Sequence, residues 1–119
     1  MQYLCLVYFE PIVIERMSPE EMRALNRDSL NYDDALRASG HYLASNALDS
    51  VKKAVTVRVR NDRMSAMDGP FAETKEHLGG FILIEAADIG EATRLASGIP
   101  LARLGSIEVR PIYRIEDPR

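Results

Sequence analysis

The chain has 119 residues and a formal net charge of −3, with 46% apolar and 28% charged residues. This composition is typical of an ordinary globular protein, and the length fits one domain spanning residues 1–119. An acidic balance argues against a nucleic-acid partner, which requires a basic face, and no apolar stretch approaches the ~20 residues of a membrane helix. We therefore expect a cytoplasmic protein that binds neither nucleic acid nor membrane.

The sequence offers few side chains for metal or redox chemistry. Its single cysteine, Cys5, excludes an internal disulfide and any site built from several cysteines. Cys5 lies in an apolar run, which predicts a buried and unreactive thiol. The two histidines, His41 and His77, show no recurrent metal-ligand spacing. We expect no metal site and no cofactor.

The first half of the chain predicts a strand followed by a long helix. The aromatic and branched residues of Tyr3–Phe9 predict the strand, and Ile12–Met17 should be a linker to the helix. The helix should run from Pro19 to Ser39, since Ser18 suits the N-cap and Glu21 the reciprocal position of a capping box. Gly40 suits a left-handed helix end. One stripe of this helix carries four of its five large apolar side chains, together with one serine: Met22, Leu25, Ser29, Tyr32 and Leu36.

The second half predicts more strands and one further helix. Tyr42–Leu48 is a weak strand or an extended loop, whereas Ala54–Arg60 alternates cleanly and should turn its valines inward. The turn at Asn61-Asp62 should return the chain as Arg63–Met67. The later elements are a strand at Leu78–Ala86, a helix opened by a second capping box at Asp88–Glu91 and stopped by Gly98 and Pro100, and a closing strand at Ser106–Ile115.

This order of elements predicts an α+β fold, with two helices on one face of an antiparallel sheet in the ferredoxin-like arrangement. Two strands carry apolar residues on both faces, so the second face also needs cover. In a chain this short the available cover is a second copy. We therefore predict a homodimer packed sheet to sheet. The side chains that require it are Leu4, Leu6, Ile82 and Ile84.

The segment from Met67 to Phe81 is the candidate functional loop, because it combines glycines, a proline and alternating charges between two strands. Asp68 is a candidate general acid or base; its alternative role is to cap the turn by bonding a backbone N–H two residues on. Lys75 and Glu76 are candidates for contacts with a polar ligand, because surface ion pairs contribute only ~0–1 kcal/mol to stability.

Three further residues and one aromatic complete the candidate site. Gly79 and Gly80 permit the backbone to approach a ligand or a partner subunit, or they mark a bulge. Arg110 either faces the cleft or pairs near Glu108. Phe71 should anchor the loop in the core.

Residues 68–76, Asp-Gly-Pro-Phe-Ala-Glu-Thr-Lys-Glu, and 78–81, Leu-Gly-Gly-Phe, resemble the signature of the YCII-related family in its DGPF-domain branch. The resemblance covers nearly the whole chain and implies a ferredoxin-like fold and a dimeric α+β barrel, but no particular reaction. Many members pair an Asp of this loop with a His on the first helix. Asp68 matches that Asp, whereas the helix Pro19–Ser39 contains no His, and Ser29 stands at or near its position.

Several functional hypotheses remain open. The first is a homodimeric binding protein that holds a small polar ligand in a cleft beside the Asp68–Phe71 loop. The second is a small enzyme of the isomerase, lyase or hydrolase type, with Asp68 as acid or base and His41 or His77 as its partner. A haem-dependent monooxygenase with one histidine as axial ligand is a third. A histidine nitrogen within ~3 Å of an Asp68 oxygen would favour catalysis.

Overall fold

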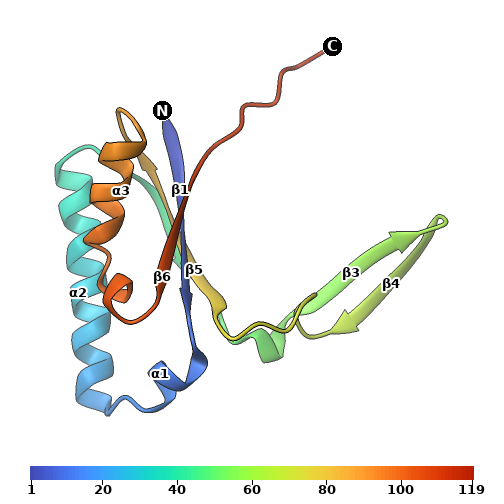
Figure 1. The fold of residues 1–119 in the computed structure, drawn as a ribbon, viewed down its shortest axis with the longest axis horizontal. Helices are drawn as coiled ribbons and strands as arrows, with labels where there is room; N and C mark the ends of the chain where they lie inside the picture. Colours follow the sequence, from blue (N-terminus) through green and yellow to red (C-terminus); the bar gives the residue numbers. More distant parts are fainter.

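In a computed structural model, which describes all 119 residues, the chain forms a four-stranded sheet and a separate two-stranded one (Figure 1). The main sheet has the order β2-β5-β1-β6, and each neighbouring pair is antiparallel. The apolar opening segment thus becomes a central strand, flanked on both sides. The strands of this sheet are β1 (Gln2–Phe9), β2 (Tyr42–Ala47), β5 (His77–Glu85) and β6 (Ser106–Pro111).

Three α-helices and two short 3₁₀ helices connect the strands: α1 (Pro11–Glu15), α2 (Pro19–Ala38), α3 (Ile89–Ser97), η1 (Val51–Lys53) and η2 (Pro100–Arg103). The predicted capping box opens α2, because Ser18 Oγ accepts from the Glu21 N–H and the Glu21 carboxylate accepts from the Ser18 N–H, both at 3.1 Å. Gly40 adopts φ +80° just beyond its end, as predicted.

Two local expectations about the helices are corrected. The segment after β1 was expected to be a linker, but Pro11 opens the short helix α1, where a missing N–H costs nothing. At α3, Asp88 Oδ1 accepts from the Glu91 N–H at 2.8 Å, but the Glu91 carboxylate accepts from the Ala87 N–H instead of completing the box.

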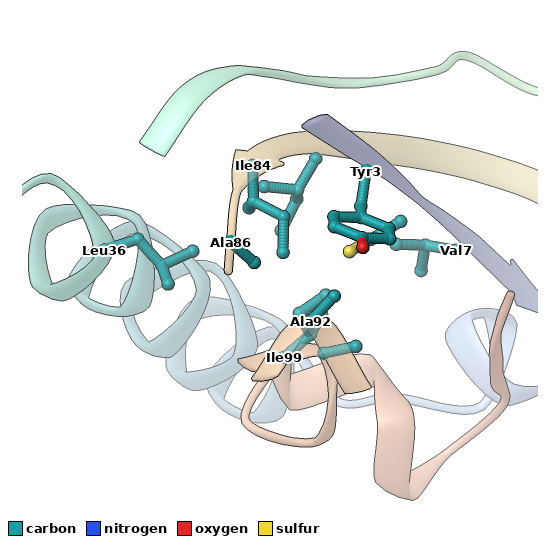
Figure 2. Close-up of a cluster of buried hydrophobic side chains, with 10 residues drawn as sticks. Tyr3, Val7, Leu36, Ile84, Ala86, Ala92 and Ile99 are labelled. Carbon is teal, nitrogen blue, oxygen red and sulfur yellow. The ribbon is translucent and has the colours of Figure 1, made fainter. Parts of the chain in front are cut away.

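The core lies between the sheet and the two longer helices, α2 and α3, which cover the same face of the sheet (Figure 1). Figure 2 shows Tyr3 and Ile84 from the strands and Ala92 and Ile99 from the helical layer gathered around this space. Cys5 is also fully buried there, as predicted. The small side chain of Ala92 lets α3 approach the sheet closely.

The other face of the sheet has no cover within the chain. The register places Leu4 opposite Leu83 and Leu6 opposite Phe81, and all four side chains are only half-buried. We call these four residues the uncovered face. The expectation that Ile82 and Ile84 need cover on this second face was wrong, because both are buried under the helices, and Phe81 and Leu83 lie on the uncovered face in their place. The strands are nevertheless apolar on both faces, as predicted.

The second sheet is a hairpin that projects from the body, on the side of the sheet away from α2 and α3 (Figure 1). It consists of β3 (Val55–Arg60) and β4 (Arg63–Asp68), and we call it the arm. Asn61 and Asp62 both have positive φ at its tip, as a two-residue hairpin turn of the favoured hand requires. The valines of β3 alternate as predicted, but they are 57–60% exposed and do not turn inward within this chain.

The uncovered face, the arm and the extended C-terminal residues 112–119 give the chain an unusually large surface (Figure 1). Its accessible surface is 8866 Å², whereas a compact monomer of this mass exposes about 6,450 Å². Its radius of gyration is 16.6 Å, against about 13.5 Å for a compact chain of this length. Only 11 of 119 residues are buried. This isolated chain therefore leaves roughly 2,400 Å² more surface exposed than a compact monomer does.

The α+β class and the antiparallel sheet with helices on one face are confirmed, and a single chain forms no closed barrel. The weak segment at Tyr42–Leu48 is a regular strand, β2, and the closing strand ends at Pro111 rather than Ile115. None of the helices is both long enough and apolar enough to cross a bilayer.

Candidate functional site

The candidate loop begins where the arm returns to the body. Gly69 has φ +100°, which strongly disfavours any residue with a side chain, and its N–H donates to the Ala54 carbonyl at 2.7 Å. The Thr56 hydroxyl donates to the Gly69 carbonyl at 2.8 Å. Two hydrogen bonds to the base of β3 thus fix the point where the loop leaves the arm.

A hollow of about 640 Å³ lies beside this loop, between the base of the arm and the end of the main sheet. We call it the loop hollow. Its walls are largely apolar, from Tyr8, Leu48, Leu78 and Phe71, and its polar groups include Glu76 and His77. Phe71 was expected to anchor the loop in the core, but it is 79% exposed at this hollow, because the arm holds the loop away from the packed helices.

Asp68 is the last residue of β4 and is exposed. Its side chain makes no hydrogen bond or ion pair within the chain, and it does not line the loop hollow. The expected turn cap two residues on is absent and was chemically impossible, because that residue is Pro70, which has no N–H. The turn therefore gains no hydrogen bond from this carboxylate.

The two histidines lie at opposite ends of β5. His77 begins the strand opposite Phe9 and lines the loop hollow. His41 lies near Glu85 at the other end, where its Nδ1 donates to the Glu85 carbonyl at 2.7 Å and lies 3.9 Å from the Glu91 carboxylate. Eight residue steps of a strand separate the two ends by roughly 26 Å. Within one chain only His77 is near the candidate loop, and neither histidine contacts Asp68.

The charged residues of the loop make weak contacts with the body. Lys75 Nζ lies 3.5 Å from a Glu10 carboxylate oxygen, with its side chain 83% exposed. Glu76 is half-buried at the hollow and accepts a long hydrogen bond of 3.4 Å from the Ser106 hydroxyl. Asp49 also lines the hollow, where the Lys53 ammonium and the Ser50 N–H hold the pKa of its carboxyl below the ordinary value.

The two glycines of β5 have a packing role. Gly79 coincides with a register shift between β5 and β1, and a Cβ there would lie 2.1 Å from the Phe9 ring. A Cβ at Gly80 would lie 2.9 Å from the Asn46 carbonyl oxygen of the neighbouring strand. The two glycines therefore form the predicted bulge. They also allow the Phe9 ring to pack against Gly79 and strand β2 to pack against Gly80.

The remaining candidates lie outside the loop hollow. Arg110 is on β6 opposite Leu4, with its Nε 3.9 Å from a Glu108 carboxylate oxygen, so it borders the uncovered face. Burial raises the pKa of the Cys5 thiol to about 11, which keeps it protonated and unreactive at neutral pH. The structure brings no three His, Cys, Asp or Glu side chains together in a metal-binding group.

One polar cluster was missed by sequence reasoning. Asp33 of α2 accepts a hydrogen bond from the Ser45 hydroxyl at 3.0 Å, and Ser45 lies 2.7 Å from the Tyr42 hydroxyl. The sequence signal was the polar stripe formed by Asn26, Ser29 and Asp33 at helical spacing. The sequence could not show that Ser45 and Tyr42 of β2 lie beside this stripe, because Tyr42–Leu48 has only a weak strand pattern.

Comparison with known proteins gives two matches. Residues 1–116 match the model of a family described as the YCII-related domain. A protein of Rhizobium meliloti (strain 1021), described as uncharacterised, is 36% identical over 114 residues, which is 94% of this chain and 92% of that protein.

Proposed function

Because this chain belongs to the YCII-related family, we propose that it acts as a homodimer that binds a small polar ligand in the loop hollow. Its Asp68–Glu76 segment supports placing it in the DGPF-domain branch, as a single domain of that kind. The sheet order β2-β5-β1-β6, with α2 and α3 on one face, supports a ferredoxin-like arrangement. A second subunit packed on the uncovered face would then complete a dimeric α+β barrel.

The exposed apolar surface supports the dimer. One face of the arm carries Val55, Val57, Val59 and Met64, which are 57–69% exposed. An isolated two-stranded hairpin is at best marginally stable in water, so a second surface is needed to stabilise this one. The excess surface of roughly 2,400 Å² per chain, counted over both chains, falls in the range that obligate homodimers bury.

The position of the arm favours a second copy as the partner. The arm projects on the same side as the uncovered face, so one body placed there would contact both apolar surfaces at once (Figure 1). Two copies of the chain would have complementary surfaces, because each copy has both an uncovered face and an arm. An interface in which the same patches meet on both subunits closes as a two-fold dimer.

The chemistry of the loop hollow supports a small polar ligand. A volume of about 640 Å³ is in the range of small-molecule sites, which combine apolar walls with a few polar groups. Phe71 carries the proposal: an aromatic side chain 79% exposed beside Glu76 and His77 is costly to leave in water, and a ligand would cover it. Glu76 and His77 would supply its hydrogen bonds.

A thermal-shift screen of small polar metabolites tests the binding function. A ligand at 100 times its dissociation constant should stabilise the protein by about 2.7 kcal/mol. Phe71→Ala and Glu76→Gln should reduce the shift, whereas Glu116→Gln, in the exposed C-terminal segment, should leave it unchanged. Equal shifts in all four proteins would contradict binding in the loop hollow.

Sedimentation velocity tests the dimer separately. The full chain should sediment as a dimer at micromolar concentration. A monomer under these conditions would exclude the homodimer, whatever the outcome of the ligand screen.

An enzymatic role is the second candidate, because His77 lines the hollow with both ring nitrogens free of protein partners. The carboxylate of Asp68, two residues before the hollow-lining Pro70, is also unpaired. A free imidazole or carboxylate can transfer a proton to or from a bound molecule. The ligands found by the screen would be incubated with the wild type and with Asp68→Asn and His77→Gln. Turnover that persists unchanged in both variants would remove these residues from any reaction.

A further inference from the structure

A second cavity lies on the opposite side of the main sheet from the uncovered face. It is a groove of about 510 Å³, which we call the helix groove, bordered by α2, β2, β5 and η2. Its floor is apolar and includes Val7 and Ile82, which face the helices. The groove shares no lining residue with the loop hollow, so the two cavities are separate.

Three of the five residues that α2 contributes to this groove are polar, beside Leu30 and Tyr32. Asn26, Ser29 and Asp33 line it at intervals of three and four residues, so they share one face of the helix. Ile99 and Leu101 add to the apolar lining of the groove. A stripe of leucines in these positions would bury that floor and stabilise the fold. The sequence instead keeps the groove open and polar on one wall.

Asp33 is held in place by a directed chain of hydrogen bonds. The Ser45 hydroxyl has one proton and donates it to Asp33 Oδ2 at 3.0 Å. The Tyr42 hydroxyl, 2.7 Å from Ser45 Oγ, must therefore be the donor in that second hydrogen bond. The chain runs from Tyr42 through Ser45 to Asp33, and it orients one carboxylate oxygen while the other accepts no hydrogen bond from the protein.

The charge on Asp33 has no counter-charge in the chain. The nearest candidate on the same helix face, Arg37, pairs with Asp34 at 2.8 Å and lies over the Tyr42 ring at 4.1 Å from its centre. No lysine, arginine or histidine lines the groove, so Asp33 is its only charged residue. A half-buried carboxylate without a charged partner favours a cation that brings its own hydrogen-bond donors.

We propose that the helix groove is a binding site for a small organic ammonium compound with a compact apolar body. The ammonium group donates to the free oxygen of Asp33, with Ser29 and Asn26 as further polar contacts. The apolar body lies on Val7, Ile82 and Leu101, and the exposed Leu30 at the rim covers it from α2.

The test compares three probes of similar shape on the ¹⁵N-labelled full chain, followed by amide chemical shifts. The probes are 2-phenylethylamine, the neutral 2-phenylethanol and the anionic 3-phenylpropionate. The amine should shift amides in residues 26–33 and 45–47 and bind about tenfold more tightly than the alcohol, because only it gains a charge-assisted hydrogen bond. The acid should not bind there. Equal affinity for amine and alcohol, or shifts confined to the loop hollow, would overturn the proposal.

Two variants and one control assign the effect to the groove. Asp33→Asn should lower the affinity for the amine to that for the alcohol, while Asp28→Asn, the same change elsewhere on α2, should leave both affinities unchanged. Ser29→Leu should fill the groove, abolish binding of both probes and raise the thermal midpoint. If Asp33→Asn fails to fold, the proposal is still tested by the Ser29→Leu variant and by the affinities of the wild type for the amine and the alcohol. An amine that binds Ser29→Leu as tightly as the wild type refutes the site.

Discussion

Gly79 shows how a single hydrogen atom in place of a side chain decides local packing. A Cβ there would lie 2.1 Å from Phe9 Cε1 and 2.6 Å from Cζ. We expect Gly79→Ala to lower the free energy of unfolding by about 1–3 kcal/mol, measured by urea denaturation at one protein concentration. Gly90→Ala, whose Cβ would meet only Asp88 Oδ1 at 3.3 Å and Arg94 Nη1 at 3.8 Å, should cause no loss. A Gly79→Ala loss that a second change, Phe9→Leu, fails to relieve would contradict this explanation.

Cys5 gives the stability a dependence on pH. Burial raises the pKa of its thiol from 9.0 to about 11, so between these values the unfolded chain has released a proton that the folded chain retains. The stabilising contribution is complete below pH 9 and is lost as the pH rises to 11, at up to about 1.4 kcal/mol per pH unit. Urea denaturation at pH 8, 9 and 10 should show a shallower decline for Cys5→Ala than for the wild type; parallel declines would refute the role of this thiol.

At the scale of the element, the start of α2 is the most fully specified feature. Ser18→Ala removes the acceptor for the Glu21 N–H and should destabilise the protein by about 1 kcal/mol. Glu21→Ala removes the reciprocal bond, and because the two bonds form one box, the double variant should lose less than the sum of the single losses. Thermal unfolding measures all three, with Ser65→Ala in the exposed arm as a control. Additive losses would contradict a cooperative box.

The predictability of the elements follows from how local their causes are. The caps of α2 and the alternation of β3 each depend on a few residues that are close in sequence, so the sequence predicted both. Whether the valines of β3 are covered depends on packing outside the hairpin. Because the arm projects from the body, the expectation that Val57 turns inward was wrong within this chain (Figure 1). For the site, residue types predicted the loop, but the convergence of Asp33 on Ser45 required the register of α2 with β2.

At the scale of the whole molecule, we predict that a charge placed on the uncovered face prevents the proposed dimer from forming. Leu6→Glu places a charge among Leu4, Phe81 and Leu83 and should convert the proposed dimer to a monomer without unfolding the helical side. Leu30→Glu makes the same change on α2, where the side chain is 65% exposed, and should leave the dimer intact. Sedimentation velocity with circular dichroism separates dissociation from unfolding. A dimeric Leu6→Glu protein would show that the subunits meet elsewhere.

The arm leaves and re-enters the body at one point. The ladder between β2 and β5 continues to the Leu48 N–H and the Gly79 carbonyl, 2.8 Å apart. His77 and Leu78 still pair with β1, so the excursion from these adjoining strands runs from Asp49 to Glu76. Lengthening such an excursion costs little, because loop-closure entropy grows only slowly with length. Insertions and deletions in this stretch can therefore accumulate over generations while the packed helices stay as they are. The length of the hairpin, and therefore the surface that it could contact, can thus change in evolution without a change in the main sheet and its helices.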